Sequence, residues 1–263
     1  MKFDDLPTIE AKFKVDAASQ LTPFSSPVPG ENLTLNGLFY KPDRSGYYYV
    51  TEYPKQRIVL HFTAGNLRSD IMNLTKQDYH VSVAFIIARD GTIYQLHPSK
   101  YWSGHIGGGV GNQGTNNRED KASIAIEISN YAYLLPVNGN LETIYSRVKD
   151  PATGKTGPVD LYCTQQQTTA FTKLNTPFRG QSYYASFTDA QIESTIILCR
   201  FLTAKYQIPR QFLPEDKRFI TFDDVVKFKG IVTHINYRSS GKWDIGPAFN
   251  WDKLIAGVTA PVV

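Results

Sequence analysis

Three side chains of types that bind metal ions lie at or near the ends of predicted strands. His61 lies in the apolar run Ile58–Phe62, His234 ends the run Gly230–His234, and Asp244 follows in a loop ten residues later. Two imidazoles and one carboxylate leave the fourth position of a tetrahedral ion open for water, as catalytic zinc requires. A lone histidine is more often structural, and the spacing alone does not join residues so distant in sequence. The trio is therefore a candidate metal site that further context must support.

The elements expected to position this trio alternate between strand and helix. Arg89-Asp90-Gly91 is a hairpin signal between two apolar runs, and Thr188-x-x-Gln191 is a capping box that opens an amphipathic helix. Strands buried on both faces and interleaved with helices favour an α/β fold, a single domain with a central mixed β-sheet flanked by helices. The expected strands are 58–62, 83–87, 92–96, 123–128 and 230–234, and the expected helices pass through Ile71 and Leu74, follow Thr188, and follow Asn250.

Three parts of the chain stand outside this alternation. Residues 1–30 are rich in Pro, Ser and Ala without a sustained period, so we interpret them as an N-terminal arm and 31–263 as the domain. The stretch from Leu33 to Val50 ends near three consecutive tyrosines and suggests strand structure near a sheet edge or the wall of a cleft. Residues 131–184 are polar and punctuated by Gly and Pro, which predicts a long insertion.

The composition is that of a globular protein and argues against nucleic acid as a partner and against a membrane span. Of the 263 residues, 41% are hydrophobic and 20% are charged, which is ordinary for a folded domain. A formal charge of +4 assists approach to an anionic polymer or is simply an ordinary surface charge, and it is too weak to indicate nucleic-acid binding. No stretch reaches the roughly 18 apolar residues of a membrane helix, so we expect no membrane span.

The N-terminal residues and the cysteines indicate the cellular compartment in which the protein is made. Residues 1–7 contain two aspartates and a proline where a signal peptide needs an apolar run. We therefore expect synthesis in the cytoplasm with no recognisable signal peptide, and the final site of action, cytoplasm or cell wall, stays open. Two cysteines are too few for a disulfide framework, and Cys199 lies on the apolar face of a predicted helix, where a buried free thiol is expected.

Four ordered segments together resemble the type 2 N-acetylmuramoyl-L-alanine amidase family. This family includes bacterial wall-recycling amidases, phage amidase endolysins and animal peptidoglycan recognition proteins. The resemblance covers roughly residues 55 to 256, and the order of the four blocks makes it fairly specific. The segments are His61–Gly65, Val81–Ile93, Ser123–Glu127 and Gly241–Trp251.

The resemblance implies a zinc-dependent enzyme that hydrolyses the amide bond between N-acetylmuramic acid and L-alanine in peptidoglycan or muropeptides. The family's zinc ligands fall on His61, His234 and Asp244, with one Zn²⁺ per chain. In the recycling branch a catalytic glutamate matches Glu127 and a lysine matches Lys242. A glutamate there can pass a proton from water to the leaving amine, and a lysine can hold the developing oxyanion. An ion pair within the sheet is the structural alternative for Glu127.

The chain also departs from the family pattern. Val83 stands where other branches have a catalytic tyrosine, so more of the proton transfer falls to the glutamate. Ala84 stands where a histidine is common, and Ile245 replaces the usual proline after the last ligand. The Trp-His-Ala-Gly block is replaced by the segment Trp102–Gly107, in which Trp102 and His105 are the expected substrate contacts. A loop histidine without a role is the alternative for His105.

The insertion has a predicted role that follows from where it begins. Residues 131–184 leave the predicted sheet shortly after Glu127, so we expect them to form a wall of the substrate cleft and to set specificity. A solvated insertion, or a contact surface for a second copy, is the alternative. The aromatic side chains that offer flat apolar faces to sugar rings or peptide side chains are Tyr145, Tyr162, Tyr183, Tyr184, Phe171 and Phe178.

Two other functions are compatible with the same residues. The first is a non-catalytic peptidoglycan-binding protein. Relatives of that kind generally lack the third zinc ligand, so the presence of Asp244 together with Glu127 and Lys242 favours the enzyme. The second is a zinc hydrolase that acts on another amide, such as a deacetylase, which only the resemblance argues against.

Overall fold

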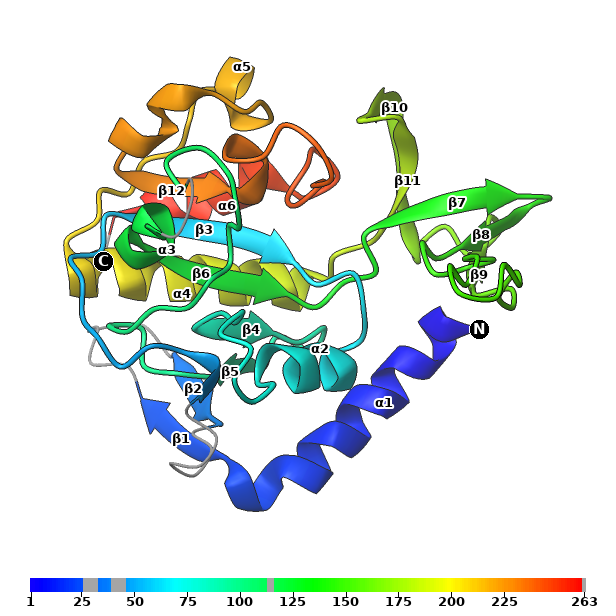
Figure 1. The fold of residues 1–263 in the computed structure, drawn as a ribbon, viewed down its shortest axis with the longest axis horizontal. Helices are drawn as coiled ribbons and strands as arrows, with labels where there is room; N and C mark the ends of the chain where they lie inside the picture. Colours follow the sequence, from blue (N-terminus) through cyan, green and yellow to red (C-terminus); the bar gives the residue numbers. More distant parts are fainter. Residues whose placement is uncertain (26–32, 39–45, 113–115, 262–263) are drawn as a thin grey trace.

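A mixed sheet forms the centre of the computed structural model, which describes residues 1–25, 33–38, 46–112 and 116–261. Its strand order is β1-β2-β5-β4-β6-β3-β12 (Figure 1). The inner pairs β4–β6, β6–β3 and β3–β12 are parallel, whereas β4–β5 is antiparallel. The strands are β1 (Thr22–Ser25), β2 (Thr34–Gly37), β3 (Arg57–Phe62), β4 (Phe85–Ile87), β5 (Ile93–Gln95), β6 (Ser123–Ile128) and β12 (Gly230–Thr233). The expected α/β fold with a central mixed sheet is confirmed.

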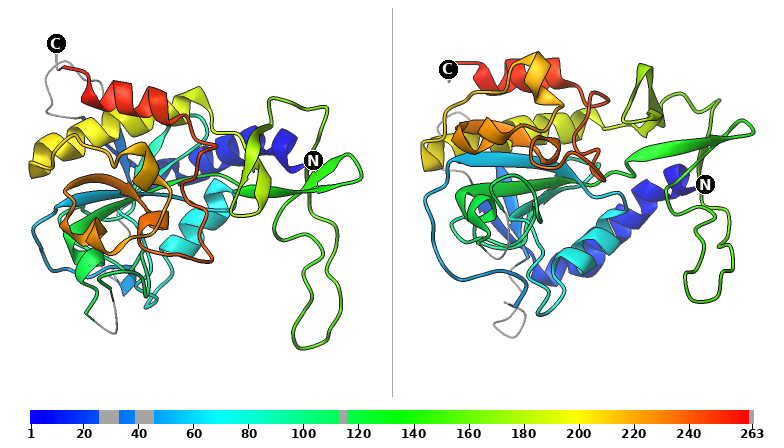
Figure 2. Two further views of the ribbon diagram at one scale, coloured as in Figure 1. Left: turned by 90° about the horizontal axis from the view of Figure 1, so that it is seen from above. Right: turned by 45° about the horizontal axis from the view of Figure 1, so that its top comes forward.

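Helices lie on both sides of this sheet, as the two views in Figure 2 show. The helix α4 begins at a capping box between Thr188 and Gln191, and α6 begins at Asn250, whose side chain accepts the Lys253 N–H. Both helix starts agree with the sequence-based expectation. The helices are α1 (Lys2–Ala17), α2 (Leu67–Leu74), α3 (Arg118–Ala122), α4 (Asp189–Tyr206), α5 (Glu215–Arg218) and α6 (Trp251–Thr259), with 3-10 turns η1 (Ala18–Gln20), η3 (Asp223–Lys227) and η4 (His234–Asn236).

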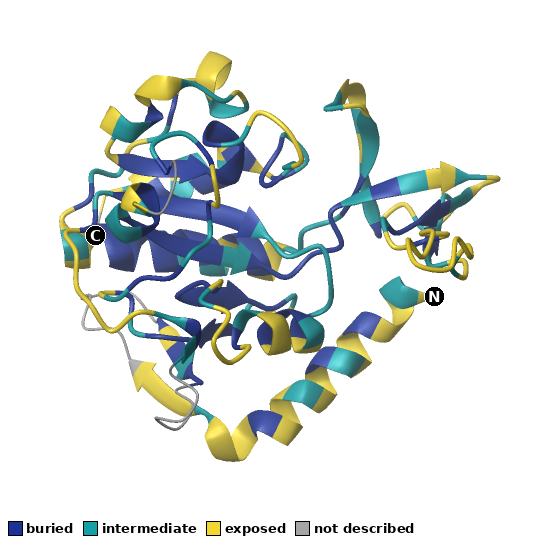
Figure 3. Ribbon diagram, in the orientation of Figure 1, coloured by how far each residue is buried: buried dark blue, intermediate teal, exposed yellow. Residues whose placement is uncertain are grey.

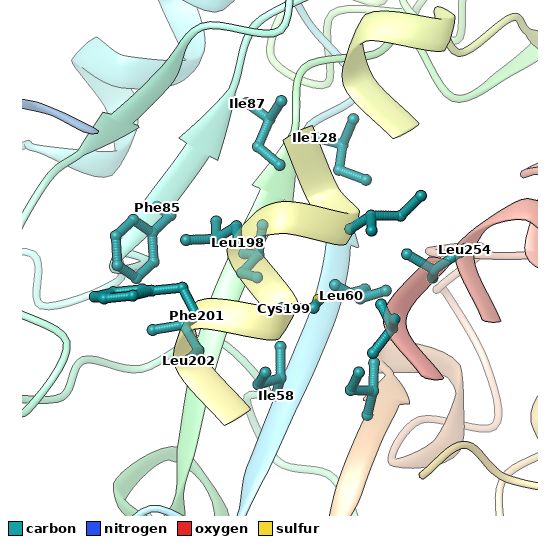
Figure 4. Close-up of a cluster of buried hydrophobic side chains, with 14 of the residues drawn as sticks. Ile58, Leu60, Phe85, Ile87, Ile128, Leu198, Cys199, Phe201, Leu202 and Leu254 are labelled. Carbon is teal, nitrogen blue, oxygen red and sulfur yellow. The ribbon is translucent and has the colours of Figure 1, made fainter. Parts of the chain in front are cut away.

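The two faces of the sheet carry different side chains because alternate residues of a strand point to opposite faces. One face contributes Ile58, Leu60 and Ile128 to a core completed by α4 and α6, which Figure 4 shows in close-up. The alternation therefore directs His61 and Glu127 to the other face. On that face two further apolar clusters form, one with residues of α2 and one that joins Val59 of β3 to Tyr237. In Figure 3 the central strands are mostly buried, with Phe62 at the end of β3 and Glu127 in β6 half-buried.

The N-terminal helix α1 was not expected from the sequence, which lacks a sustained apolar period there. Its first half packs on the insertion, where Leu6 is buried and the Lys2 ammonium lies 3.1 Å from an Asp160 carboxylate oxygen. Its second half packs on the domain, where the Glu10 carboxylate accepts the Arg89 N–H at 3.0 Å. The helix thus bridges the two parts (Figure 1). Residues 26–30 of the expected arm and 39–45 of the expected strand region lie outside the described residues.

The insertion is an antiparallel sheet rather than the long loop that its Gly, Pro and polar residues indicated. The strand order is β10-β11-β7-β8-β9, and the sheet extends away from the central one (Figure 1). Because Tyr162 and Tyr184 are only 0% and 2% exposed, neither ring is available to a substrate, contrary to expectation. The strands are β7 (Tyr133–Val137), β8 (Asn140–Glu142), β9 (Leu161–Thr164), β10 (Phe171–Phe178) and β11 (Gln181–Ala185).

The burial of the cysteines agrees with the sequence-based expectation. Cys163 and Cys199 are both buried and free, as expected for Cys199. None of the helices in the described part of the chain is long and apolar enough to cross a membrane.

Candidate metal and catalytic site

The structure brings the three predicted metal ligands together. His61 is the fifth residue of β3, His234 follows the last residue of the adjacent strand β12, and Asp244 lies in the loop beyond. The Nδ1 atoms of the two histidines are 2.9 Å apart, and the Asp244 Oδ2 atom lies 3.0 Å from His61 Nδ1 and 2.9 Å from His234 Nδ1. Ligands about 2.0–2.1 Å from a tetrahedral ion would be roughly 3.3 Å apart. The three atoms therefore have the spacing of a metal site, and the group can hold a metal ion.

The proton positions on the two histidines support this assignment. His234 Nε2 lies 3.0 Å from the Ile106 carbonyl oxygen, which can only accept a hydrogen bond, so Nε2 carries the proton. In the neutral ring, Nδ1 then presents a lone pair to the carboxylate of Asp244. Two electron-rich atoms at 2.9 Å repel each other unless a cation lies between them. The chemistry of these donors thus fits a metal ion better than a direct hydrogen bond.

A chain of hydrogen bonds sets the tautomer of the other histidine. The Ser123 hydroxyl donates to the Glu119 carbonyl oxygen at 2.5 Å, so its oxygen accepts the proton of His105 Nε2 at 2.9 Å. His105 Nδ1 then accepts from His61 Nε2 at 3.0 Å. This direction of donation leaves His61 Nδ1 with a lone pair facing His234 and Asp244. Hydrogen bonds of this kind orient metal-binding histidines in many proteins.

Asp120 positions the segment that contacts both histidines. Its Oδ1 atom accepts the backbone N–H groups of His105 and Ile106, at 2.8 and 2.9 Å. His105 contacts one metal-binding histidine through its ring, and Ile106 contacts the other through its carbonyl oxygen. The buried Asp120 carboxylate therefore positions both groups that hydrogen-bond to the rings of His61 and His234.

The charges at the site follow from burial. Burial lowers the pKa of His61 to about 4, so its ring is neutral near pH 7 and suited to bind a metal. Burial alone would raise the pKa of Asp244, but the neighbouring His234 and His61 outweigh it and the pKa is lowered. Asp244 is therefore a carboxylate anion. A neutral His61 imidazole and the Asp244 anion are donors of the kind that a divalent cation prefers at a catalytic site.

Glu127 lies beside this donor set with a free carboxylate oxygen. It pairs directly with His61 in the parallel ladder between β3 and β6, so both side chains leave the sheet on the same face. Its Oε2 atom is buried and has no hydrogen-bond partner within the described ranges. Burial raises its pKa well above the ordinary value, and the nearby Asp244 and Asp70 carboxylates add to the rise. A carboxyl group held in this way is suited to accept and return a proton.

A cavity of about 370 Å³ opens beside His234, whose side chain forms part of its lining. Lys242 and Arg238 supply positive charge to its wall near His234, and neither residue is fully buried. On the wall the rings of His80, Tyr49 and Trp102 form a stack, with centroid distances of 4.3 and 4.1 Å. A cavity with a cationic edge and an aromatic edge can hold a ligand that carries both carboxylates and apolar surface.

Trp102 and His105, the two residues expected to contact substrate, instead make contacts with other residues of the protein. The Trp102 indole is only 7% exposed, stacks on Tyr49, and donates its N–H to the Thr51 hydroxyl at 2.7 Å. His105 has a side chain that is 4% exposed, and both its ring nitrogens have protein partners. Neither His105 nitrogen is free for the substrate contact expected from the sequence. Of the two stacked rings, that of Tyr49 is more exposed than that of Trp102, at 36% against 7%.

Several residues of the site were missed by the sequence analysis. Ser123 and Asp120 support the metal ligands, and Tyr49 and His80 line the cavity. The run of tyrosines that ends at Tyr49 was a usable signal, because it indicated strand structure near an edge or a cleft wall. Nothing in the local sequence around Asp120 or His80 points to the site, since both reach it through tertiary contacts.

Comparisons with known proteins agree with this geometry. The sequence model of the N-acetylmuramoyl-L-alanine amidase family matches residues 51–247, about three quarters of the chain. The chain belongs to this family. A comparison with curated proteins finds no match.

Several solved structures of amidases are similar to this family member. The chain aligns with the amidase AmiD from E. coli at 20% identity and a TM-score of 0.48, covering 79% of this chain and 59% of AmiD. It aligns with AmpD at 16% identity and a TM-score of 0.46, covering 84% and 97%. The amidase LysC from Clostridium intestinale gives 15% identity and a TM-score of 0.44, covering 88% and 100%. The chain thus spans less than two thirds of the AmiD chain.

Proposed function

We propose that this protein is a zinc-dependent N-acetylmuramoyl-L-alanine amidase that cleaves peptidoglycan or muropeptides. The family match over residues 51–247 supports the activity. The observation that carries the proposal for this chain is the convergence of His61, His234 and Asp244, with three donor atoms 2.9–3.0 Å apart. The proposal assigns one Zn²⁺ to these three residues. Zinc bound there would supply a Lewis acid that activates water and polarises the lactyl carbonyl of the substrate.

Glu127 carries out the proton transfers in this proposal. Water adds to the lactyl carbonyl carbon and loses a proton to the Glu127 carboxylate. The bond between this carbon and the nitrogen of L-alanine then breaks, and Glu127 returns the proton to the leaving amine. Its unpartnered, buried Oε2 atom and its place opposite His61 support this role.

The residues that line the cavity bind and orient the substrate in this proposal. Lys242 stabilises the oxyanion that develops on the carbonyl oxygen, because its side chain lines the cavity beside His234. The stacked rings of His80, Tyr49 and Trp102 form the aromatic edge of the cavity that contacts the sugar or peptide. Trp102 fixes the Tyr49 ring by stacking on it, and His105 holds His61 in orientation.

A non-catalytic peptidoglycan-binding protein is the alternative function. The features that favour the enzyme are those that binding alone does not need. Asp244 completes a three-donor set with an open fourth position, and Glu127 places a proton acceptor next to it. Binding of wall fragments needs only the cavity.

The direct test is hydrolysis of a defined muramyl peptide. The purified protein is incubated with the peptide, and free stem peptide with an N-terminal L-alanine is measured by mass spectrometry. We expect release with zinc present, loss of release after chelation, and recovery on adding zinc. Asp244→Ala is the matched variant, and it should lose stoichiometric zinc in elemental analysis. A protein that binds the muramyl peptide with zinc in place but leaves it intact would establish the binding alternative.

A further inference from the structure

The loop that carries Lys242 and Asp244 is held by the insertion. This loop, Arg238–Gly246, has no regular secondary structure of its own between η4 and the turn before α6. The turn between β10 and β11 contacts it from the insertion. The Arg179 guanidinium donates to the Arg238 carbonyl oxygen at 3.2 Å and also to the Lys242 carbonyl oxygen. One side chain therefore ties together two points of the loop.

Further contacts bind the same two segments. The Trp243 indole N–H donates to the Arg179 carbonyl oxygen at 3.2 Å, which makes the interaction reciprocal. The Tyr133 ring of β7 lies 4.7 Å from the Trp243 ring. The Phe178 ring lies so close to Gly246 that a side chain at Gly246 would meet it at 2.8 Å. The loop is thus contacted on both sides of Asp244 by residues of the insertion.

The backbone at Arg179 suggests that its side chain is needed at this position. Phe178 pairs with Gln181, so Arg179 and Gly180 are the two central residues of the turn. Both have positive φ, 47° and 80°. Turns of this kind favour Asn, Asp or Gly, and a long side chain at the first position is unfavourable by itself. The hydrogen bonds of the guanidinium to the loop account for an arginine there.

We propose that Arg179 is a positioning residue that holds the Arg238–Gly246 loop, and with it Asp244 and Lys242, in the arrangement the site requires. The insertion thereby stabilises the third metal ligand, in addition to any role as a cleft wall. Without these contacts the loop carbonyls lose two donors and the position of Asp244 relative to His61 and His234 is less restricted. This inference rests on the zinc site proposed above.

The test compares Arg179→Ala and Arg179→Lys with Arg147→Ala. Arg147 is a matched control because it is an arginine of the same insertion whose guanidinium contacts Glu142, away from the loop. The first readout is amide hydrogen exchange in the metal-free proteins. We expect faster exchange in residues 238–246 of Arg179→Ala, unchanged exchange in β3 and β6, partial restoration in Arg179→Lys, and no change in the loop of Arg147→Ala.

The second readout is zinc affinity by competition with a chelator. Outer contacts of metal sites commonly change affinity by about 10–100-fold, and we expect a loss of about tenfold in Arg179→Ala. The kcat of amide hydrolysis should fall more than KM changes. Wild-type exchange in the loop and wild-type zinc affinity in Arg179→Ala would overturn the inference. If the wild-type protein itself binds no zinc, the proposed function fails, while the exchange measurement still decides the role of Arg179.

Discussion

His61 and Glu127 face each other across the parallel ladder of β3 and β6, so the proposed metal ligand and the proposed proton acceptor leave neighbouring strands on the same face. Neighbouring strands lie only about 4.8 Å apart, which keeps the two backbones close regardless of side-chain motion. The face that they share is opposite to the one covered by α4 and α6. The pairing of these two central strands therefore sets the distance between the two backbones.

The first prediction concerns this proton acceptor. Glu127→Gln keeps the shape of the side chain and removes its ability to accept a proton. We expect kcat for muramyl peptide hydrolysis to fall by about 10²–10⁴, the range for loss of a general base. Zinc content and thermal stability should stay at their wild-type values. Near-normal turnover in this variant would assign the proton transfer to another group.

The second prediction concerns Lys242. Truncation in Lys242→Ala removes a charge from the cavity wall beside His234 but leaves its backbone carbonyl, which accepts from Arg179. We expect a fall in kcat of about 10²–10³, as for loss of one oxyanion donor. Arg238→Ala, which removes another charge from the same cavity wall, is the comparison. Equal losses in the two variants would indicate a general effect of charge rather than oxyanion stabilisation.

The third prediction concerns His105, which the structure connects to His61. His105→Phe keeps an aromatic ring but removes the acceptor for His61 Nε2 and the donor to Ser123. We expect zinc affinity to fall by about 10–100-fold, with catalysis recovering in excess zinc. Chelator competition measures the affinity. If affinity is unchanged and only KM rises, His105 contacts substrate, as the sequence suggested.

The fourth prediction concerns the pH dependence of stability. Asp70 in α2 is 7% exposed, and burial raises its pKa from 3.8 to about 7 although Thr63 and Ser129 hydrogen bonds oppose the rise. A carboxyl with a raised pKa in the folded state stabilises the fold fully below the unfolded pKa. This contribution is lost as pH rises from about 4 through about 7. Three pH units correspond to at most about 4 kcal/mol.

Asp70→Asn tests this dependence, because an amide resembles the protonated acid and does not titrate. We expect the free energy of unfolding of the variant to decrease less between about pH 4 and pH 7 than that of the wild type. Urea unfolding at several pH values measures it. The exposed Asp216→Asn serves as control. Parallel curves for wild type and Asp70→Asn would show that Asp70 does not titrate in this range.

The fifth prediction concerns the loop between β8 and β9. Its exposed apolar side chains include Tyr145, Val148 and Val159, each more than half exposed, and the loop extends from the insertion in Figure 2. Replacement of residues 147–157 by a short Gly-Ser linker spares the β10–β11 turn and α1 contacts. We expect unchanged zinc affinity and a higher KM or an altered preference for the stem peptide. Unchanged kinetics on every substrate would show that this loop does not contribute to specificity.

Part of the fold and the site was determined by the sequence alone. The hairpin at Asp90-Gly91 and the capping box at Thr188 depend on contacts within a few residues, so local residue types suffice to predict them. The central strands follow from short apolar runs, which only a buried sheet accommodates. The types of His61, His234 and Asp244 made them a candidate metal site, and only with the resemblance to the amidase family could residues so distant in sequence be joined.

The tertiary structure decided what depends on contacts between distant segments. The helix α1 lacks a strong apolar period and is stabilised by its contacts with both the domain and the insertion. The insertion forms a sheet through strand pairing that its polar residues did not predict. The role of His105 depends on His61, 44 residues away, and that of Arg179 on the loop around Lys242, 63 residues away. Local residue types do not encode such partners, because the hydrogen bonds that define these roles form only when the chain has folded.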